Sequence, residues 1–238
     1  MNKIICLGDS ITKGKVWNED ERRPYITDNS YPGILKKLLN SDVENEGICD
    51  INTDVMLKHL GNEIKFDEGS SVIIEMGGND CNPKWKEIKR DPDGIHDAIV
   101  PLGRFKENMV KIINIIKGYG AAPILSTLPP LDADRYFSLL RKVFGMDIKR
   151  WIDREGGIYK WQEKYSDAVG AIARKMSIPL IDIRSSFLNT ADYKKYMSYD
   201  GVHPNEQGYT QIANECCRRI RDLTGKGRMA SNILTLSV

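Results

Sequence analysis

Five short apolar runs, separated by longer segments with the pattern of helices, constrain the fold of this chain more than any other feature. Strands that alternate with helices typically form a parallel sheet, because each connection between parallel strands must cross over the sheet. Right-handed crossovers place helices on both faces, so we expect a three-layer α/β/α fold with a five-stranded parallel sheet. The runs lie near residues 3–7, 43–47, 71–76, 122–126 and 179–183.

The segments between the runs carry apolar residues at the three- and four-residue steps of a single helix face. One such stripe spans residues 102–116, and another spans residues 161–176. The last helix is expected to begin after Pro204, with Asn205 as its N-cap. Ligands on an open sheet covered in this way bind beyond the carboxyl ends of the strands.

The chain has 238 residues and an apolar content of 41%, which is enough for one sizeable core. We therefore expect one domain over residues 1–223, followed by a polar, weakly ordered tail over residues 224–238. Two insertions, near residues 81–101 and 130–157, interrupt the regular pattern. Most of their aromatic side chains are expected to anchor the insertions to the core.

Charge and cysteine content exclude several classes of protein. The formal net charge of +2 gives no case for nucleic-acid or anionic-membrane binding. The five cysteines include no C-x-x-C pair, which argues against a disulfide framework and a structural zinc site. No apolar stretch is long enough for a signal peptide or a spanning helix. We therefore expect a cytoplasmic protein with no membrane insertion, no metal and no cofactor.

Two motifs at opposite ends of the chain carry residues for nucleophilic catalysis. Asp200-Gly201-Val202-His203-Pro204 places a carboxylate three residues before one of only three histidines. A carboxylate in this position fixes the tautomer of an imidazole and stabilises the imidazolium form. Gly8-Asp9-Ser10, directly after the first apolar run, supplies the candidate nucleophile Ser10. Either motif alone is weak, because both are ordinary loop chemistry.

Two further motifs, Asn45-Glu46-Gly47 and Gly77-Gly78-Asn79-Asp80, close the second and third apolar runs. With four motifs in this order, the chain from residue 3 to about 223 resembles the SGNH, or GDSL, hydrolase family. The family's four blocks contribute a serine, a glycine, an asparagine and a histidine, which here are Ser10, Gly47, Asn79 and His203. The resemblance implies the flavodoxin-like strand order 2-1-3-4-5. The family often has a second glycine where this chain has Asp50.

The resemblance implies a carboxylic ester hydrolase. His203 accepts the proton of Ser10 during attack on an ester carbonyl and returns it to the leaving alcohol, while Asp200 orients His203. The backbone N–H groups of Ser10 and Gly47, with the side-chain amide of Asn79, are assigned to the oxyanion of the tetrahedral intermediate. The partner is a small-molecule ester, and the oligomeric state is left open.

We expect short-chain esters, acetyl esters foremost, of a carbohydrate or another small alcohol, because the sequence contains no strongly apolar lid segment. Trp17 and Trp85 are the candidates for substrate contact, since each follows shortly after a motif. A lysophospholipase or an acyl-thioesterase of the same family is the alternative.

Two other functions compete with this interpretation. The segment from Gly8 to Lys15 superficially resembles a nucleotide-binding P-loop, but it has five residues between its glycines and Val16 after the lysine. A non-catalytic carbohydrate-binding protein of the same fold is expected to lack at least one of the four motifs. Asp9 and Asp80 are expected to brace loops. His59 and His96 have no such companions and are expected to be surface or packing residues.

Overall fold

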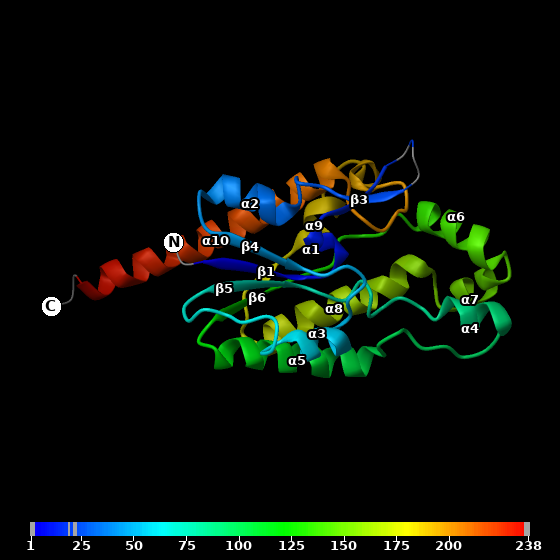
Figure 1. Cartoon of the computed structure of the whole chain (residues 1–238), viewed down its shortest axis with the longest axis horizontal. Helices are drawn as coiled ribbons and strands as arrows, with labels where there is room; N and C mark the ends of the chain where they lie inside the picture. Colours follow the sequence, from blue (N-terminus) through cyan, green and yellow to red (C-terminus); the bar gives the residue numbers. More distant parts are fainter. Residues whose placement is uncertain (1–2, 19, 21–22, 236–238) are drawn as a thin grey trace.

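The architecture is described from a computed structural model, which covers residues 3–18, 20 and 23–235, with side chains described up to residue 225. Five parallel strands form its central sheet in the order β4-β1-β5-β6-β7 (Figure 1). Numbered among themselves along the chain, these strands have the order 2-1-3-4-5, so the predicted topology is confirmed. The strands are β1 (Ile4–Gly8), β4 (Val43–Gly47), β5 (Ser71–Glu75), β6 (Ala122–Ser126) and β7 (Leu180–Ile181).

The last strand is shorter than the run predicted near residues 179–183. Asp182 ends it by capping helix α9 (Ile183–Leu188), since its Oδ1 accepts a hydrogen bond from the backbone N–H of Ser185 at 3.1 Å. Aspartate is among the residues that most favour a helix start. The chain therefore leaves the sheet directly after Ile181.

Helices cover both faces of the sheet, the arrangement expected of right-handed crossovers. Successive side chains of a strand point to opposite faces, so β1 serves both layers. Ile5 and Leu7 pack in the core beneath one layer of helices, and Ile4 and Cys6 pack beneath the other. The first layer contains α3 (Thr53–His59), α5 (Leu102–Gly118) and α8 (Ile158–Met176), and the second contains α2 (Tyr31–Leu39), α9 and α10 (Glu206–Thr235) (Figure 1).

A two-stranded antiparallel ribbon follows the first turn of the chain. It consists of β2 (Lys15–Trp17) and β3 (Pro24–Ile26), and it pairs Val16 with Tyr25. The sequence pattern did not predict this ribbon, because three residues per strand are too few to show an alternation. The ribbon places Lys15 and Trp17 next to the carboxyl end of β1.

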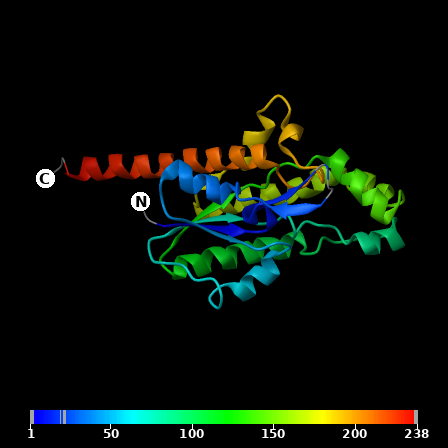
Figure 2. The same ribbon diagram turned by 45° about the horizontal axis from the view of Figure 1, so that its top comes forward.

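The two predicted insertions pack together beyond the carboxyl ends of the strands (Figures 1 and 2). Trp85 and Trp151 meet edge to face at 5.9 Å between ring centroids within an apolar cluster of their own. Trp151 also meets Trp161, which packs on the main core, so these aromatic residues anchor the insertions to each other and, through Trp161, to the core. The insertions contain α4 (Trp85–Arg90), α6 (Ala133–Phe144) and α7 (Ile148–Arg154).

The last helix begins where the sequence predicts. The side-chain Oδ1 of Asn205 accepts a hydrogen bond from the N–H of Gly208 at 3.0 Å, which satisfies one of the free donors at the start of α10. The backbone then stays helical to Thr235, beyond residue 223, where the sequence suggested that an irregular tail begins. No proline interrupts residues 224–235, and glycine weakens a helix without blocking it. The end of the predicted tail, residues 236–238, lies outside the described residues.

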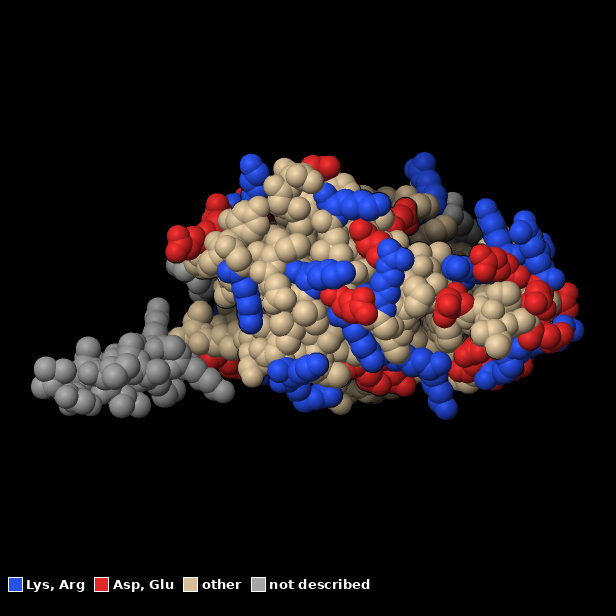
Figure 3. All heavy atoms as spheres, turned by 90° about the horizontal axis from the view of Figure 1, so that it is seen from below, with Lys and Arg blue, Asp and Glu red and all other residues tan. Residues whose placement is uncertain are grey.

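The surface in Figure 3 carries basic and acidic side chains interspersed over the same face. Within the part of the chain that the structure describes, no helix is both long enough and apolar enough to span a bilayer.

Candidate functional site

The turn after β1 places Ser10 at the carboxyl edge of the sheet. Asp9 starts the one-turn helix α1 (Ser10–Lys13), and its Oδ1 accepts a hydrogen bond from the N–H of Ile11 at 2.9 Å. Glycine is required at position 8, because a Cβ there would lie 2.1 Å from Thr12 Oγ1. The chain then enters β2 and not a long helix, so this turn lacks the strand–loop–helix context of a P-loop.

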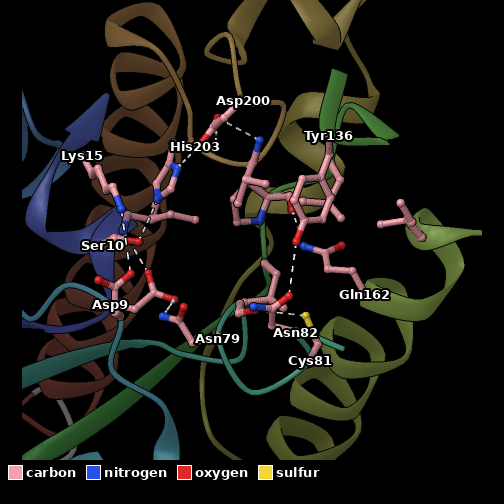
Figure 4. A pocket seen from close by; sticks show the side chains of 18 of the residues that line it. Asp9, Ser10, Lys15, Asn79, Cys81, Asn82, Tyr136, Gln162, Asp200 and His203 are labelled. Atoms are coloured by element: carbon pink, nitrogen blue, oxygen red, sulfur yellow. Dashed lines mark hydrogen bonds and ion pairs between the residues drawn. The ribbon is translucent and has the colours of Figure 1, made fainter. Parts of the chain in front are cut away.

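Ser10, His203 and Asp200 form a continuous hydrogen-bonded chain (Figure 4). Ser10 Oγ lies 2.9 Å from His203 Nε2, although the two residues are separated by 193 positions. His203 Nδ1 lies 2.5 Å from Asp200 Oδ2. The other oxygen, Asp200 Oδ1, accepts the backbone N–H groups of Val202 and His203, each at 3.0 Å. One carboxylate therefore shapes its own loop and orients the imidazole, as the Asp-x-x-His spacing suggested.

The loop that carries His203 is held from two sides. It follows the 3-10 helix η1 (Tyr193–Tyr196), and the N–H of Ser198 donates to the carbonyl of His203 at 2.8 Å. From the second insertion, Arg135 Nη1 donates a hydrogen bond to the carbonyl of Met197 at 2.9 Å. The backbone N–H of Asp132, in the same insertion, donates to the carbonyl of Gly201 at 2.9 Å. The insertion thus packs directly on the loop that positions the imidazole.

Asn79 lines the same cleft, close to Ser10 (Figure 4). Its Nδ2 donates a hydrogen bond to the carbonyl of Ile51 at 2.9 Å, and it reaches Asp9 Oδ2 at 3.4 Å. The hydrogen bond to Ile51 holds the amide in place, while the contact with Asp9 is long, so the second amide hydrogen can be shared between Asp9 and a ligand oxygen in the cleft. The structure therefore unites four of the five predicted site residues, which are Ser10, Asn79, Asp200 and His203.

Gly47 is the fifth predicted site residue, and the structure contradicts its assignment. Its N–H already donates to Asn45 Oδ1 at 2.9 Å, and Gly47 is not among the residues that line the cleft. Position 47 needs glycine for packing, because a Cβ would lie 2.2 Å from the backbone nitrogen of Lys13. Asp50 lines the cleft instead, with φ +60°. Among the described residues, no group accepts a hydrogen bond from the N–H of Asp50.

Three buried carboxyl groups lie behind the site. Burial raises the pKa of Asp9 to about 6, with the N–H of Ile11 opposing the shift. Burial also raises the pKa of Asp80 to about 6, against hydrogen bonds from Thr53. The pKa of Glu75 is raised further, first by burial and then by Asp9. Asp9 and Asp80 brace their loops as expected, whereas nothing in the pattern of β5 indicated a role for Glu75.

A cleft of about 260 Å³ extends from Ser10 toward the insertions. Trp17 lines it as predicted, but Trp85 does not, because Trp85 is buried and its Nε1 donates to Asn82 Oδ1 at 2.9 Å. Tyr136 and Trp161 contribute instead. Trp161 packs against the core as the helix stripe over residues 161–176 predicts, and from the first turn of α8 it borders the cleft as well.

The remaining histidines and cysteines lie outside this arrangement, with one exception. His59 pairs with Glu63 on the surface, and the largely covered side chain of His96 bonds to the carbonyl of Asp91, as expected of surface or packing residues. Cys81 lines the cleft, but burial raises the pKa of its thiol far above the usual range, so it stays a thiol. Within residues 3–18, 20 and 23–225, no three His, Cys, Asp or Glu side chains group as metal ligands.

Comparisons with known proteins identify relatives of the same fold. The uncharacterised lipoprotein YqeF of Bacillus subtilis is 23% identical over 87% of this chain and 77% of its own. A lipase/acylhydrolase structure from Enterococcus faecalis is similar with a TM-score of 0.65 and 21% identity, over 93% of this chain and 96% of that one. The carbohydrate acetylesterase Est24 of Sinorhizobium meliloti is similar with a TM-score of 0.64 and 17% identity, over 94% and 100%.

The family model described as "GDSL-like Lipase/Acylhydrolase family" matches residues 6–211. The match covers the turn after β1, both intermediate motifs and the loop that carries His203. The chain belongs to the GDSL-like lipase/acylhydrolase family.

Proposed function

We propose that this protein is a serine carboxylic ester hydrolase in which Ser10, His203 and Asp200 act as a catalytic triad. The observation that carries the proposal is the unbroken chain from Ser10 Oγ through the imidazole to Asp200, at the end of a cleft. A serine hydroxyl is a poor nucleophile unless a base removes its proton during attack. His203 Nε2 lies within the distance that such a transfer requires.

The reaction has two halves. Ser10 Oγ attacks the ester carbonyl as its proton passes to His203 Nε2, and the imidazolium then gives that proton to the leaving alcohol. Water repeats the sequence on the acyl-enzyme and regenerates Ser10. Asp200 Oδ2 accepts the Nδ1 proton throughout, which holds the tautomer that leaves Nε2 free to accept.

The oxyanion is proposed to bind to three donors at the edge of the sheet. They are the N–H groups of Ser10 and Asp50 and the side-chain amide of Asn79. Among the described residues, neither of these N–H groups has a hydrogen-bond acceptor, and all three residues line the cleft. Asp50 takes the place that the sequence assigned to Gly47, since a donor already bonded to Asn45 is not free for substrate.

Replacing Asn79 tests this set of donors. Asn79→Ala is expected to lower kcat by about 100- to 1000-fold, the usual cost of one oxyanion donor, with a much smaller change in KM. The exposed Asn62→Ala is the matched control, because Asn62 donates only to the carbonyl of Lys58 on the surface. Steady-state kinetics on a p-nitrophenyl ester give both constants. A kcat within a few-fold of the parent would exclude Asn79 from the oxyanion site.

The proposed substrates are short-chain esters, with acetyl foremost, of a carbohydrate or another small alcohol. One structural neighbour is a carbohydrate acetylesterase, which supports this class at the level of the fold. The cleft has Lys15, Asp50 and Trp17 on one side, where a polar alcohol finds charges and an aromatic face. A lysophospholipase or an acyl-thioesterase remains the alternative, because Leu139, Ile158 and Trp161 give the other side an apolar character.

A panel of esters decides between these classes. For p-nitrophenyl esters, kcat/KM is expected to fall from acetate through butyrate to octanoate, since each methylene that does not fit costs about 1–3 kcal/mol. The kcat/KM for release of acetate from acetylated sugars should be higher than the kcat/KM for cleavage of an acyl-thioester or a lysophospholipid. A maximum at octanoate, with thioester or lysophospholipid preferred, would replace the short-chain proposal by the alternative and leave the triad unchanged.

A further inference from the structure

A fully buried glutamate lies beneath the nucleophile turn, where the proposed mechanism does not use it. Glu75 is the last residue of β5 and pairs in register with Gly8, directly before Asp9. Its side chain is completely inaccessible to solvent. An ionised carboxylate in such a place is strongly disfavoured unless a cation or several donors face it.

The surroundings of Glu75 provide no cation. Thr12 Oγ1 donates to Glu75 Oε2 at 3.3 Å, and the same hydroxyl lies 3.0 Å from the Tyr31 hydroxyl. The other titratable groups that face Glu75 are Asp9, Tyr31, Tyr209 and Cys216. Burial raises the pKa of both tyrosines and of the thiol, so these three are neutral. No ion pair among the described residues includes Glu75.

The second carboxylate oxygen of Glu75 is buried without a partner. Oε1 has no hydrogen-bond partner among the described residues, and the carboxyl group as a whole lies next to that of Asp9. Asp9 in turn accepts the N–H of Ile11 on Oδ1 and faces the Asn79 amide with Oδ2. A proton on Glu75 gives Oε1 a partner and turns two repelling carboxylates into a donor and an acceptor.

We propose that Glu75 is a positioning residue that stays protonated and donates a hydrogen bond to ionised Asp9, so that Asp9 holds the turn of Ser10 and the amide of Asn79. The hydrogen bonds then run in one direction, from Tyr31 through Thr12 and Glu75 to Asp9. An ionised Asp9 can only accept hydrogen bonds. It therefore favours the orientation of the Asn79 amide in which Nδ2, and not the amide oxygen, faces the carboxylate. The inference rests on the proposed function, in which Asn79 contributes to the oxyanion site.

Two substitutions at position 75 distinguish the need for a hydrogen-bond donor from the need for a negative charge. Glu75→Gln keeps a donor of the same shape and is expected to keep kcat within about threefold of the parent, whereas Glu75→Leu removes the donor and is expected to lower kcat about tenfold or more. KM should change little in either variant, because Glu75 does not line the cleft. Glu46→Gln is the control for loss of a carboxylate, because Glu46 lies on β4 and β1 separates β4 from β5. Equal losses in Glu75→Gln and Glu75→Leu would overturn the proposal, as would a folded Glu75→Leu with the kcat of the parent.

Two measurements do not depend on activity, so they distinguish a failure of this inference from a failure of the proposed function. The infrared carbonyl stretch of a protonated carboxylic acid should be present in the parent at neutral pH and lost in Glu75→Gln. Because the folded pKa of Glu75 is raised, its stabilising protonated form is lost as pH rises through that pKa. As the pH rises, the Tm of the parent should therefore fall relative to the Tm of Glu75→Gln. A parent without the band, with parallel Tm profiles, would show that Glu75 is ionised.

Discussion

Ser10→Ala is expected to lower kcat by about 10⁴-fold or more, with the fold intact. The reason is that catalytic triads act as a unit, so removing the nucleophile removes nearly the whole chemical contribution. His203→Ala should cost a similar factor, and the double variant should cost little more than either single one. Kinetics on p-nitrophenyl acetate, with circular dichroism as the check on folding, measure the effect. Ser138→Ala is the matched control, because Ser138 bonds only within α6 on the surface.

A fluorophosphonate probe should label the protein once, at Ser10, since Ser10 Oγ is the hydroxyl that lies against the imidazole of His203. Labelling that survives Ser10→Ala would contradict the assignment. A small thiol reagent should slow the enzyme little, because burial keeps Cys81, the cysteine that lines the cleft, in its unreactive thiol form. Complete inactivation by that reagent, with Ser10→Ala still active, would indicate a cysteine mechanism.

Asp200→Asn is expected to lower kcat by roughly 10⁴-fold, the cost of the equivalent change in a well-studied triad. An amide at this position removes the charge that stabilises the imidazolium and favours the wrong tautomer of His203. In the parent, activity should rise with pH as the imidazole loses its proton, because an imidazolium cannot accept the proton of Ser10.

The pH–rate profile of kcat/KM for Asp200→Asn, recorded beside that of the exposed Asp153→Asn, measures both effects. Asp153 pairs only with Lys149 on the surface, so its variant should reproduce the parent profile. A profile that is flat between about pH 5 and 9, with His203→Ala as active as the parent, would exclude the triad.

The second insertion contributes more to the site than a border for the cleft. Asp132 and Arg135 both bond to the backbone of the loop between Met197 and Gly201. Gly201 fits this packing only because it lacks a Cβ, which would lie 2.5 Å from the carbonyl of Asp132. The orientation of His203 therefore depends on an element that is far away in the sequence and carries none of the four family motifs.

The local sequence predicted the five strands of the central sheet and the helices between them, although not the ribbon of β2 and β3. Alternating apolar runs and stripes predicted the parallel sheet, and Asn205 marked the start of the last helix because a cap is a local hydrogen bond. Asp200 and His203 are three residues apart, so their spacing alone predicted the contact between them. The family motifs then predicted that Ser10 and Asn79 lie beside this pair.

Tertiary structure decided what depends on contacts between distant segments. The motif assigned the oxyanion donor to Gly47, three residues before Asp50, yet the Gly47 N–H is occupied by Asn45 and the Asp50 N–H has no acceptor among the described residues. Trp85 is buried by Trp151, while Trp161 lines the cleft.

Glu75 illustrates the same limit most clearly. As one acidic residue at the end of an apolar strand, it gives no local sign of its state. Its burial and its contact with Asp9 arise only when β5 pairs with β1 and α1, α2 and α10 close over the strand ends. The periodicity of a sequence indicates which face of a helix or strand a residue occupies. The protonation state of a carboxyl group and the availability of an N–H donor depend instead on which partners the assembled fold brings within hydrogen-bonding distance.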